Sequence, residues 1–279
     1  MKQLLFFLLL PLTTHTQSDS RHLTVGLYNF GLGALTGGIG SMIHKAKGTK
    51  HWDAFKQGAL KGSVGATVSY MGKHVVRTQK VNGKNHQLWI PKLIHSIGNS
   101  MTHNASQHKG LFDSYYLHIG MNRFEFHFKN EFRFSYKIMP IATLGFLEMW
   151  RRHGSPDWKH SLQLLTPVFT SKRSWDDHRA YELQNSIFAV KRNGFISFLY
   201  HEIIHSFQHI DFLPVNNYYQ FFRKKEKPVW FVKLNKLTYW DLNSVMLNQT
   251  FYKIENINKQ RHSDNFLEYE AFYFSDRNY

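Results

Sequence analysis

The stretch His201-Glu202-Ile203-Ile204-His205 decides the architecture expected for this chain of 279 residues. It follows the pattern H-E-x-x-H, which predicts a helix with both histidines on one face, because residues four apart in an α-helix lie one above the other. Both imidazoles can then reach a single metal ion, and Glu202 can act on a water molecule bound to that ion. The residue types and their spacing therefore indicate hydrolytic metal chemistry.

The residues around the motif separate a core face of the helix from a ligand face. An apolar stripe at helical spacing comprises Ile196, Leu199, Ile203, Phe207 and Ile210. The opposite side carries His201, His205 and Gln208. The alternative interpretation is an amphipathic helix whose solvated polar face holds two histidines by chance, and it leaves Glu202 unexplained.

A third ligand is required, because a catalytic zinc ion takes three protein ligands and keeps one position for water. His209 lies about 12 Å beyond His201 along a continuous helix at 1.5 Å per residue, which is too far for both to bind one ion. The metzincin pattern solves this problem with a glycine turn, but residues 206–208 contain no glycine. The third ligand is therefore expected elsewhere in the chain.

Two carboxylates follow on a second predicted helix, which begins near Phe266. The segment Ser263-Asp264-Asn265 precedes it, and each of these residue types favours the N-cap of a helix. The helix carries Glu268 three residues before Ala271 and Glu270 directly before it. Either glutamate can supply a carboxylate oxygen to a zinc ion, unless both are ordinary surface charges.

The H-E-x-x-H motif, together with Glu268 in an E-x-x-A context, resembles the gluzincin clan of metallopeptidases. The resemblance covers these two helices only. It implies a zincin-like C-terminal part, a bound zinc ion (Zn²⁺) and the hydrolysis of a peptide or protein substrate. It further implies that His201, His205 and Glu268 bind the zinc ion and that Glu202 is the catalytic general base.

The chain departs from the family pattern at two places on the second helix. Glu270 is a rival metal ligand, less favoured because its offset from Ala271 does not match the family. The family often continues with Asp after that alanine, where this chain has Phe272. A carboxylate that orients a ligating histidine must then come from elsewhere or be missing.

The N-terminus has the layout of a secretory signal over residues 1–17. Lys2 precedes an apolar stretch from Leu4 to Leu10, and a polar exit runs from Thr13 to Gln17. The chain has no cysteine, which excludes disulfides, thiolate metal ligands and lipid attachment through an N-terminal cysteine. We therefore expect an exported protein, processed near Gln17, that is periplasmic, cell-envelope-associated or secreted.

The formal net charge is +16, and most of the excess lies in residues 1–110, where 13 Lys or Arg stand against only Asp19 and Asp53. A basic surface attracts polyanions, so peripheral contact with acidic lipid headgroups or an anionic envelope polymer is expected. The expected export and the lack of any nucleic-acid-binding motif argue against nucleic acid as a partner.

A glycine-rich repeat dominates residues 18–110. The segment Gly33–Gly40 recurs as Gly58–Gly65, following GALxGxxG, and each copy contains a G-x-x-x-G step. Small residues four apart let two helices approach closely, which predicts an antiparallel helical hairpin around the basic linker from Lys45 to Lys56. Both apolar runs are too short for a membrane span. The alternative to an enzyme is a non-enzymatic envelope or membrane-associated protein built on this hairpin, or a metal-binding pseudoenzyme.

Residues 111–279 are expected to be β-rich before the metal-binding helices. Alternating apolar residues predict a β-hairpin with arms at 115–128 and 132–138 and some slippage near Asn122. Further strands are predicted at 162–170 and 186–190, and a helix at 240–251. The fold class expected is thus α+β, with a glycine-rich helical N-terminal part and a zincin-like C-terminal part.

A second group of histidines lies within the predicted helix of residues 93–109. His95, His103 and His108 stand there near Asn99 and Asn104. A second metal site is one interpretation of this group, and polar residues scattered over a helix are the other.

Overall fold

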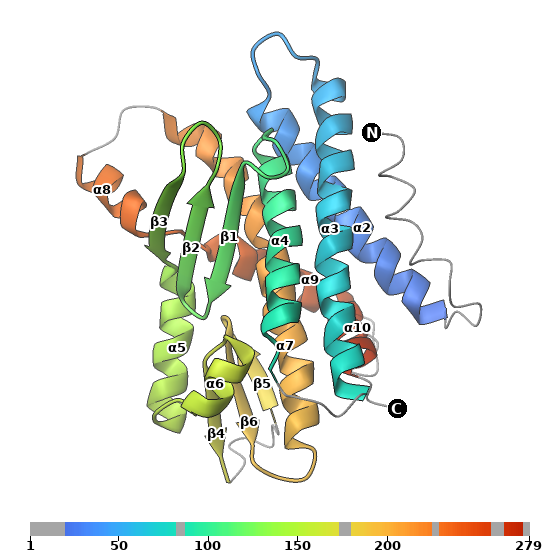
Figure 1. Ribbon diagram of the computed structural model, residues 1–279, viewed down its shortest axis with the longest axis vertical. Helices are drawn as coiled ribbons and strands as arrows, with labels where there is room; N and C mark the ends of the chain where they lie inside the picture. Colours follow the sequence, from blue (N-terminus) through green and yellow to red (C-terminus); the bar gives the residue numbers. More distant parts are fainter. Residues whose placement is uncertain (1–19, 82–86, 173–179, 225–228, 258–264, 276–279) are drawn as a thin grey trace.

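The computed structural model describes residues 20–81, 87–172, 180–224, 229–257 and 265–275, which form a mixed α+β protein (Figure 1). The expected signal segment, residues 1–17, and the predicted cap residues Ser263 and Asp264 lie outside the described residues. No helix in these ranges is both long enough and apolar enough to cross a membrane.

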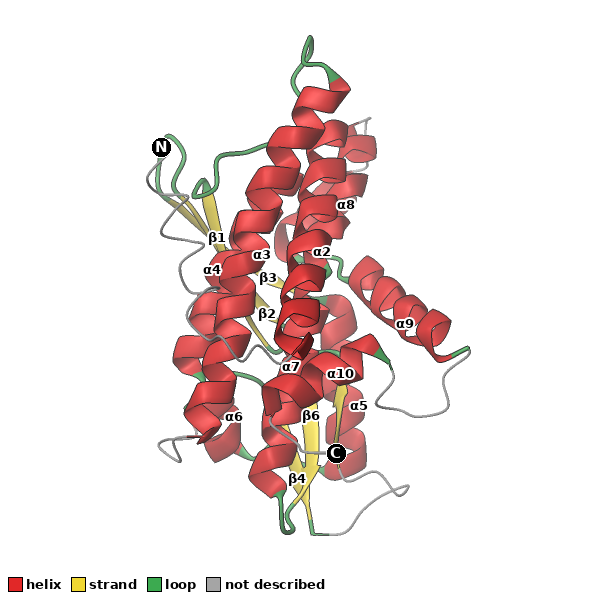
Figure 2. Cartoon of the chain, turned by 90° about the vertical axis from the view of Figure 1, so that its right-hand side faces the viewer, coloured by secondary structure: helices red, strands yellow, loops and turns green. Residues whose placement is uncertain are grey.

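Three long helices stand side by side and form one layer of the molecule (Figures 1 and 2). They are α2 (Ser20–His44), α3 (His51–Val81) and α4 (Trp89–Ser106). The α2–α3 pair is the predicted hairpin, and its glycine steps face each other. A Cβ atom on Gly37 would overlap the carbonyl oxygen of Gly58, and one on Gly62 would overlap that of Gly33. The predicted close packing is therefore confirmed.

Sheet A is an antiparallel meander of β1 (Ser114–Ile119), β2 (Asn122–His127) and β3 (Arg133–Ile138). The sequence predicted two strands here, and the first predicted arm is in fact broken into β1 and β2. The expected slippage near Asn122 is a tight turn at Gly120 and Met121, where Gly120 has a φ of 55°. The alternation of apolar residues continues through this turn, so the sequence pattern alone does not indicate it.

Sheet B lies at the opposite end of the layer from the α2–α3 loop (Figure 1). Helices α5 (Pro140–His153) and α6 (Trp158–Leu164) lead into β4 (Val168–Ser171), β5 (Ala180–Leu183) and β6 (Ser186–Val190). The strand order is β4-β6-β5, with β4 parallel and β5 antiparallel to β6. The strand β5 therefore has one neighbour among the described strands and forms an edge of the sheet.

The strand predicted over residues 162–170 is wrong in its first part, which belongs to α6. Asp157 caps this helix by accepting a hydrogen bond from the backbone N–H of His160, and Leu165, in the left-handed region, ends it. The strand predicted at 186–190 is confirmed as β6. Its partner β5 was not predicted. The two are joined by Gln184 and Asn185, both with positive φ, as in the tight turns that suit β-hairpins.

The chain continues with α7 (Phe195–Asp211), the 3₁₀ segment η2 (Leu213–Lys224), α8 (Val229–Leu237), α9 (Leu242–Asn256) and α10 (Phe266–Ser275). The helix predicted at 240–251 is confirmed as α9, which starts two residues later and extends further. The helix α7 contains the H-E-x-x-H motif. Its predicted apolar stripe is confirmed, because Leu199, Ile203, Phe207 and Ile210 are buried.

One hydrophobic core connects the motif helix to the N-terminal helices. Leu199 and Ile203 of α7 belong to the same buried cluster as Val25 of α2, Tyr70 of α3 and Phe274 of α10. The helix α10 packs on both α7 and α3. The position of the second predicted ligand helix therefore depends on the glycine-rich hairpin.

The close contact in the hairpin gives a first prediction. Gly37→Ala and Gly62→Ala should each destabilise the protein by about 1–3 kcal/mol, because the added Cβ meets backbone atoms that cannot move aside without separating the helices. Urea unfolding measures the loss. Gly31→Ala on α2 is the matched control, since nothing lies near its added Cβ. It should stabilise the helix slightly, and equal effects at all three glycines would contradict the packing.

Lys92 of α4 gives a second prediction, concerning pH. Its buried ammonium donates hydrogen bonds to the carbonyl oxygen of Leu165 and the hydroxyl of Thr166, and burial lowers its pKa to about 7. The unfolded chain therefore binds more protons between about pH 7 and 10, so this group makes stability rise with pH in that window, by up to about 1.4 kcal/mol per unit.

The Lys92→Met variant tests this linkage. Within this window, the unfolding free energy of Lys92→Met should exceed that of the wild type most near pH 7. The difference should shrink toward pH 10, because the unfolded lysine also loses its proton there and burying the neutral amine no longer carries the cost of removing it. Urea unfolding of both proteins across this window measures the difference. A difference that does not change with pH would show that Lys92 keeps its proton in the fold.

Candidate metal centre

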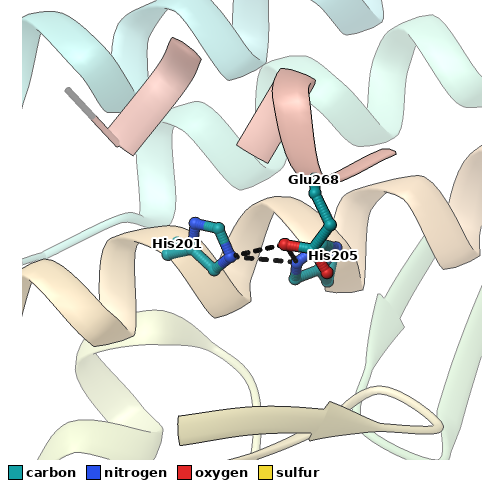
Figure 3. A group of neighbouring side chains, drawn as sticks. All are labelled: His201, His205 and Glu268. Carbon is teal, nitrogen blue, oxygen red and sulfur yellow. Dashed lines mark hydrogen bonds and ion pairs between the residues drawn. The ribbon is translucent and has the colours of Figure 1, made fainter. Parts of the chain in front are cut away.

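The two histidines of the motif project from one face of α7 toward α10, where Glu268 meets them (Figure 3). The Nε2 atoms of His201 and His205 lie 3.2 Å apart. The Oε2 atom of Glu268 lies 3.2 Å from Nε2 of His201 and 3.5 Å from Nε2 of His205. The predicted convergence of the three side chains is confirmed, and together they form a group that could hold a metal ion.

The spacing of these three atoms fits the edges of a small coordination tetrahedron. Zinc binds histidine nitrogen and carboxylate oxygen at about 2.0–2.2 Å, so tetrahedral ligand atoms lie about 3.3–3.6 Å from each other. The separations of 3.2, 3.2 and 3.5 Å match this edge. Two histidines and one glutamate leave a fourth corner for water or substrate, which is the donor set of several catalytic zinc sites.

Glu268 also binds the histidines electrostatically. Burial lowers the pKa of His205, but the hydrogen bond from His205 to Glu268 and the charge of that carboxylate outweigh burial and raise the pKa to about 9. The imidazolium and the carboxylate therefore attract each other and hold the ligand atoms together. A metal ion must displace this proton in order to bind Nε2.

Glu270, the rival ligand, lies outside this group and has a different role. Its Oε1 accepts hydrogen bonds from Asn29 and Lys73, at 2.6 and 2.9 Å, and its Oε2 accepts one from Gln208 at 2.8 Å. Glu268 and Glu270 therefore separate as the family resemblance implied, with Glu268 toward the histidines.

Gln208 orients His205. The amide Nε2 of Gln208 donates hydrogen bonds to Glu270 and to the carbonyl oxygen of Leu267, which fixes which end of the amide is the oxygen. That oxygen lies 2.8 Å from Nδ1 of His205 and can only accept, so Nδ1 carries the hydrogen and Nε2 is the nitrogen available to a metal. Glu270 in turn holds Gln208, because its Oε2 accepts a hydrogen bond from the amide of Gln208.

His201 is held mainly by packing. The ring of Phe272 lies 4.3 Å from its imidazole, measured between centroids, at the position where the family often has Asp. The hydroxyl of Ser275 is 3.5 Å from its Nδ1, at the outer limit of a hydrogen bond. The departure at Phe272 thus replaces a charged contact with an aromatic one.

Glu202 lies beside the three ligands in the wall of a pocket of about 630 Å³. The pocket is bounded by β5, α7, α9 and α10, and Glu182 and Tyr252 also line it. Glu202 is 5% exposed, so the polar face of α7 is covered rather than open to solvent as an amphipathic surface helix would be. Burial raises the pKa of Glu182 to about 7, so this third carboxyl group of the pocket gains or loses a proton near neutral pH.

His209 and the histidines of α4 do not join a metal group. Burial lowers the pKa of His209 to about 4, and its ring lines the same pocket without reaching the ligand set. His95 binds Asp211 at 2.9 Å, His103 faces Arg123, and His108 contacts the hydroxyl of Ser41. In the part of the chain that the structure describes, these three histidines serve separate contacts and do not converge on one metal group, and His108 lies beyond the end of α4.

The sequence did not reveal the roles of Gln208 and Lys73. Gln208 carried a signal, since it lies three residues after His205 on the same helical face. Lys73 is more than a hundred residues away from α7 in sequence. Only the packing of α3 against α10 brings it near the centre.

The chain was compared with known proteins. No protein-family model matches it. No curated protein matches it. No solved structure matches it. Any assignment of function therefore depends on the geometry of the site.

The contact between Gln208 and His205 gives a third prediction. Gln208→Met should weaken zinc binding about 10–100-fold, because the variant fills the same space but no longer accepts the hydrogen bond from His205. The variant should fold but be less stable than the wild type, since it also removes the hydrogen bonds to Leu267 and to the buried Glu270. Zinc affinity can be measured by competition with a chelator of known strength.

Two further variants serve as controls for this measurement. Gln249→Met makes the same change elsewhere in the pocket wall and should bind zinc as the wild type does. Glu268→Gln removes a charged ligand and should abolish binding at the same zinc concentration. Equal affinities for Gln208→Met and Gln249→Met would show that Gln208 does not position the ligand.

Proposed function

We propose that this protein is a zinc-dependent hydrolase with a zincin-like catalytic centre, and that its substrates are peptides or proteins. The observation that carries the proposal is the convergence of His201, His205 and Glu268 at tetrahedral spacing, with Glu202 beside them in a pocket. Together with the secretory layout of residues 1–17, the same proposal makes it an exported enzyme.

A zinc ion held by these three ligands would polarise a carbonyl group and make a neighbouring water molecule more acidic. Glu202 would accept the proton of that water molecule and pass it to the leaving amine. Its neighbours restrict access of bulk water, since Glu202 is almost fully buried. The Nε2 atoms of His201 and His205 would carry no proton while the ion is bound.

The shape of the pocket supports an extended substrate. Residues Ala180 to Leu183 of β5 line it, and β5 is an edge strand that pairs with β6 on one side. An edge strand can add a peptide strand by main-chain hydrogen bonds, which suits a peptide more than a compact small molecule. In zincins, an edge strand near the motif helix commonly binds the substrate in this way.

Glu202→Gln is the decisive variant and gives a fourth prediction. It keeps the size and hydrogen-bonding capacity of the side chain but cannot accept a proton. Zinc content and melting temperature should stay at wild-type values, while cleavage of a broad peptide library should fall roughly 10²–10⁴-fold. Mass spectrometry of the library products measures turnover, and metal analysis measures zinc.

Other results would favour the competing functions. Zinc bound by the wild type without cleavage of any library peptide would indicate a pseudoenzyme. A protein without zinc whose residues 18–110 mediate binding to acidic vesicles would favour a non-enzymatic, membrane-associated role. Equal turnover by the wild type and Glu202→Gln would exclude Glu202 as the general base.

A further inference from the structure

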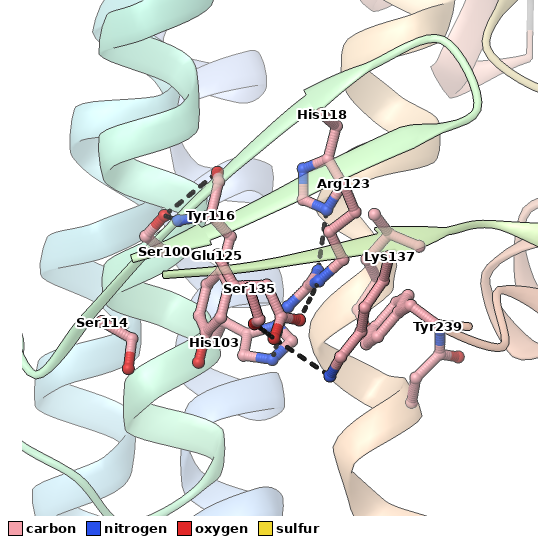
Figure 4. Close-up of polar contacts among 12 residues, drawn as sticks. Ser100, His103, Ser114, Tyr116, His118, Arg123, Glu125, Ser135, Lys137 and Tyr239 are labelled. Atoms are coloured by element: carbon pink, nitrogen blue, oxygen red, sulfur yellow. Dashed lines mark hydrogen bonds and ion pairs between the residues drawn. The ribbon is translucent and has the colours of Figure 1, made fainter. Parts of the chain in front are cut away.

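A second cavity, of about 480 Å³, lies on the polar face of sheet A and shares no lining residue with the metal pocket. Alternate residues of the sheet line it: Tyr116 on β1, Arg123 and Glu125 on β2, and Ser135 and Lys137 on β3 (Figure 4). The helices α4 and α8 complete the wall with residues that include Lys236. We call this cavity the Arg123 pocket.

Arg123 forms a fixed, charged floor of the Arg123 pocket. Its side chain is 1% exposed, and its guanidinium lies over the rings of Tyr116 and Tyr239, at 4.2 and 3.8 Å from their centroids. Its Nε donates a hydrogen bond to Glu125 at 2.6 Å, and its Nη1 lies 2.7 Å from Nε2 of His118. A guanidinium held on both faces and along its edge has little freedom to move.

The charges that line the pocket do not balance. Glu125 is the single carboxylate among the described lining residues, and it is shared by Arg123, by Lys137 at 3.0 Å and by the hydroxyl of Ser135 at 3.0 Å. Lys109 and Lys236 also line the pocket, which leaves a formal excess of three positive charges. Asp113, whose charge also acts on Lys109, pairs with Lys129 outside the lining.

Unbalanced cations in a partly closed cavity create a positive potential that favours an anion. Burial lowers the pKa of Lys109 despite the opposing effects of Asp113 and Glu125, so its ammonium is poorly solvated. An anion beside it would replace the missing water. The volume of about 480 Å³ falls within the usual range of small-molecule sites.

We propose that the Arg123 pocket binds a compact oxyanion, such as a phosphate- or carboxylate-bearing small molecule. Lys109, Lys137 and Lys236 supply the charge, while the side-chain amide of Asn235 in the wall can donate to hydroxyl or oxyanion oxygens. The site is independent of the zinc chemistry. It accounts for a cluster of cations, from the buried Arg123 to the exposed Lys236, that the hydrolase proposal does not use.

Calorimetric titration with inorganic phosphate and with citrate tests the site, and this is the fifth prediction. The wild type should show one saturable site at low ionic strength for at least one of the two anions. The double variant Lys109→Met/Lys236→Met should bind that anion at least tenfold more weakly. The double variant Lys47→Met/Lys50→Met, which removes the same charge from the exposed α2–α3 loop, should bind it as the wild type does.

Two further measurements make the outcome specific. His205→Ala should bind the anion unchanged, which separates the Arg123 pocket from phosphate bound to zinc. If Lys109→Met/Lys236→Met fails to fold, the single variant Lys236→Met, at an exposed position, replaces it and should show a weaker but measurable loss. No saturable binding of either anion would overturn the proposal. So would an equal loss in the loop variant, or binding of acidic vesicles alone.

Discussion

The structure depends on one buried ion cluster that joins the N-terminal helices to the candidate metal centre. Lys73 of α3, which is 1% exposed, lies 2.7 Å from Asp211 at the end of α7 and 2.9 Å from Glu270 of α10. Burial opposes its charge, but Asp211 and Glu270 raise its pKa above the ordinary value. Removing one member of such a cluster leaves a buried charge without its partner, which typically costs about 3–5 kcal/mol. The cluster therefore fixes the relative positions of α3, α7 and α10.

The glycine hairpin makes this cluster possible. Lys73 can reach α7 and α10 only because α3 lies close to its neighbours, and Gly72, beside it, packs against the backbone of α4 at Pro91 and His95. Asn29 of α2 donates a hydrogen bond to Glu270 from the other side. The glycine-rich helices thus support the candidate metal centre structurally. This packing role is separate from the basic composition of the same helices.

Local patterns revealed much of this arrangement. The spacing of His201 and His205, the E-x-x-A context of Glu268 and the repeated glycines each predict contacts that need only a helix and its period. The same reasoning failed where the packing of distant segments determines which side chains are buried. Alternation across sheet A shows which residues share a face, but not that the charged face, with Arg123 and Glu125, turns inward and the aromatic face outward. The hydrogen bonds that connect Glu270 through Gln208 to His205 likewise depend on how α10 packs against α7.

The three candidate ligand atoms are positioned by groups that lie outside the set that could hold a metal ion. Phe272 packs on His201, Gln208 fixes the tautomer of His205, and Glu270, tied to Lys73, anchors the helix that carries Glu268. Bringing two imidazoles and a carboxylate within 3.5 Å removes them from water, which costs free energy that the fold must supply. A surface helix with incidental histidines has no reason to bear this cost. In a group that could hold a metal ion such an arrangement would favour binding, because ligands fixed in advance lose less entropy when an ion binds.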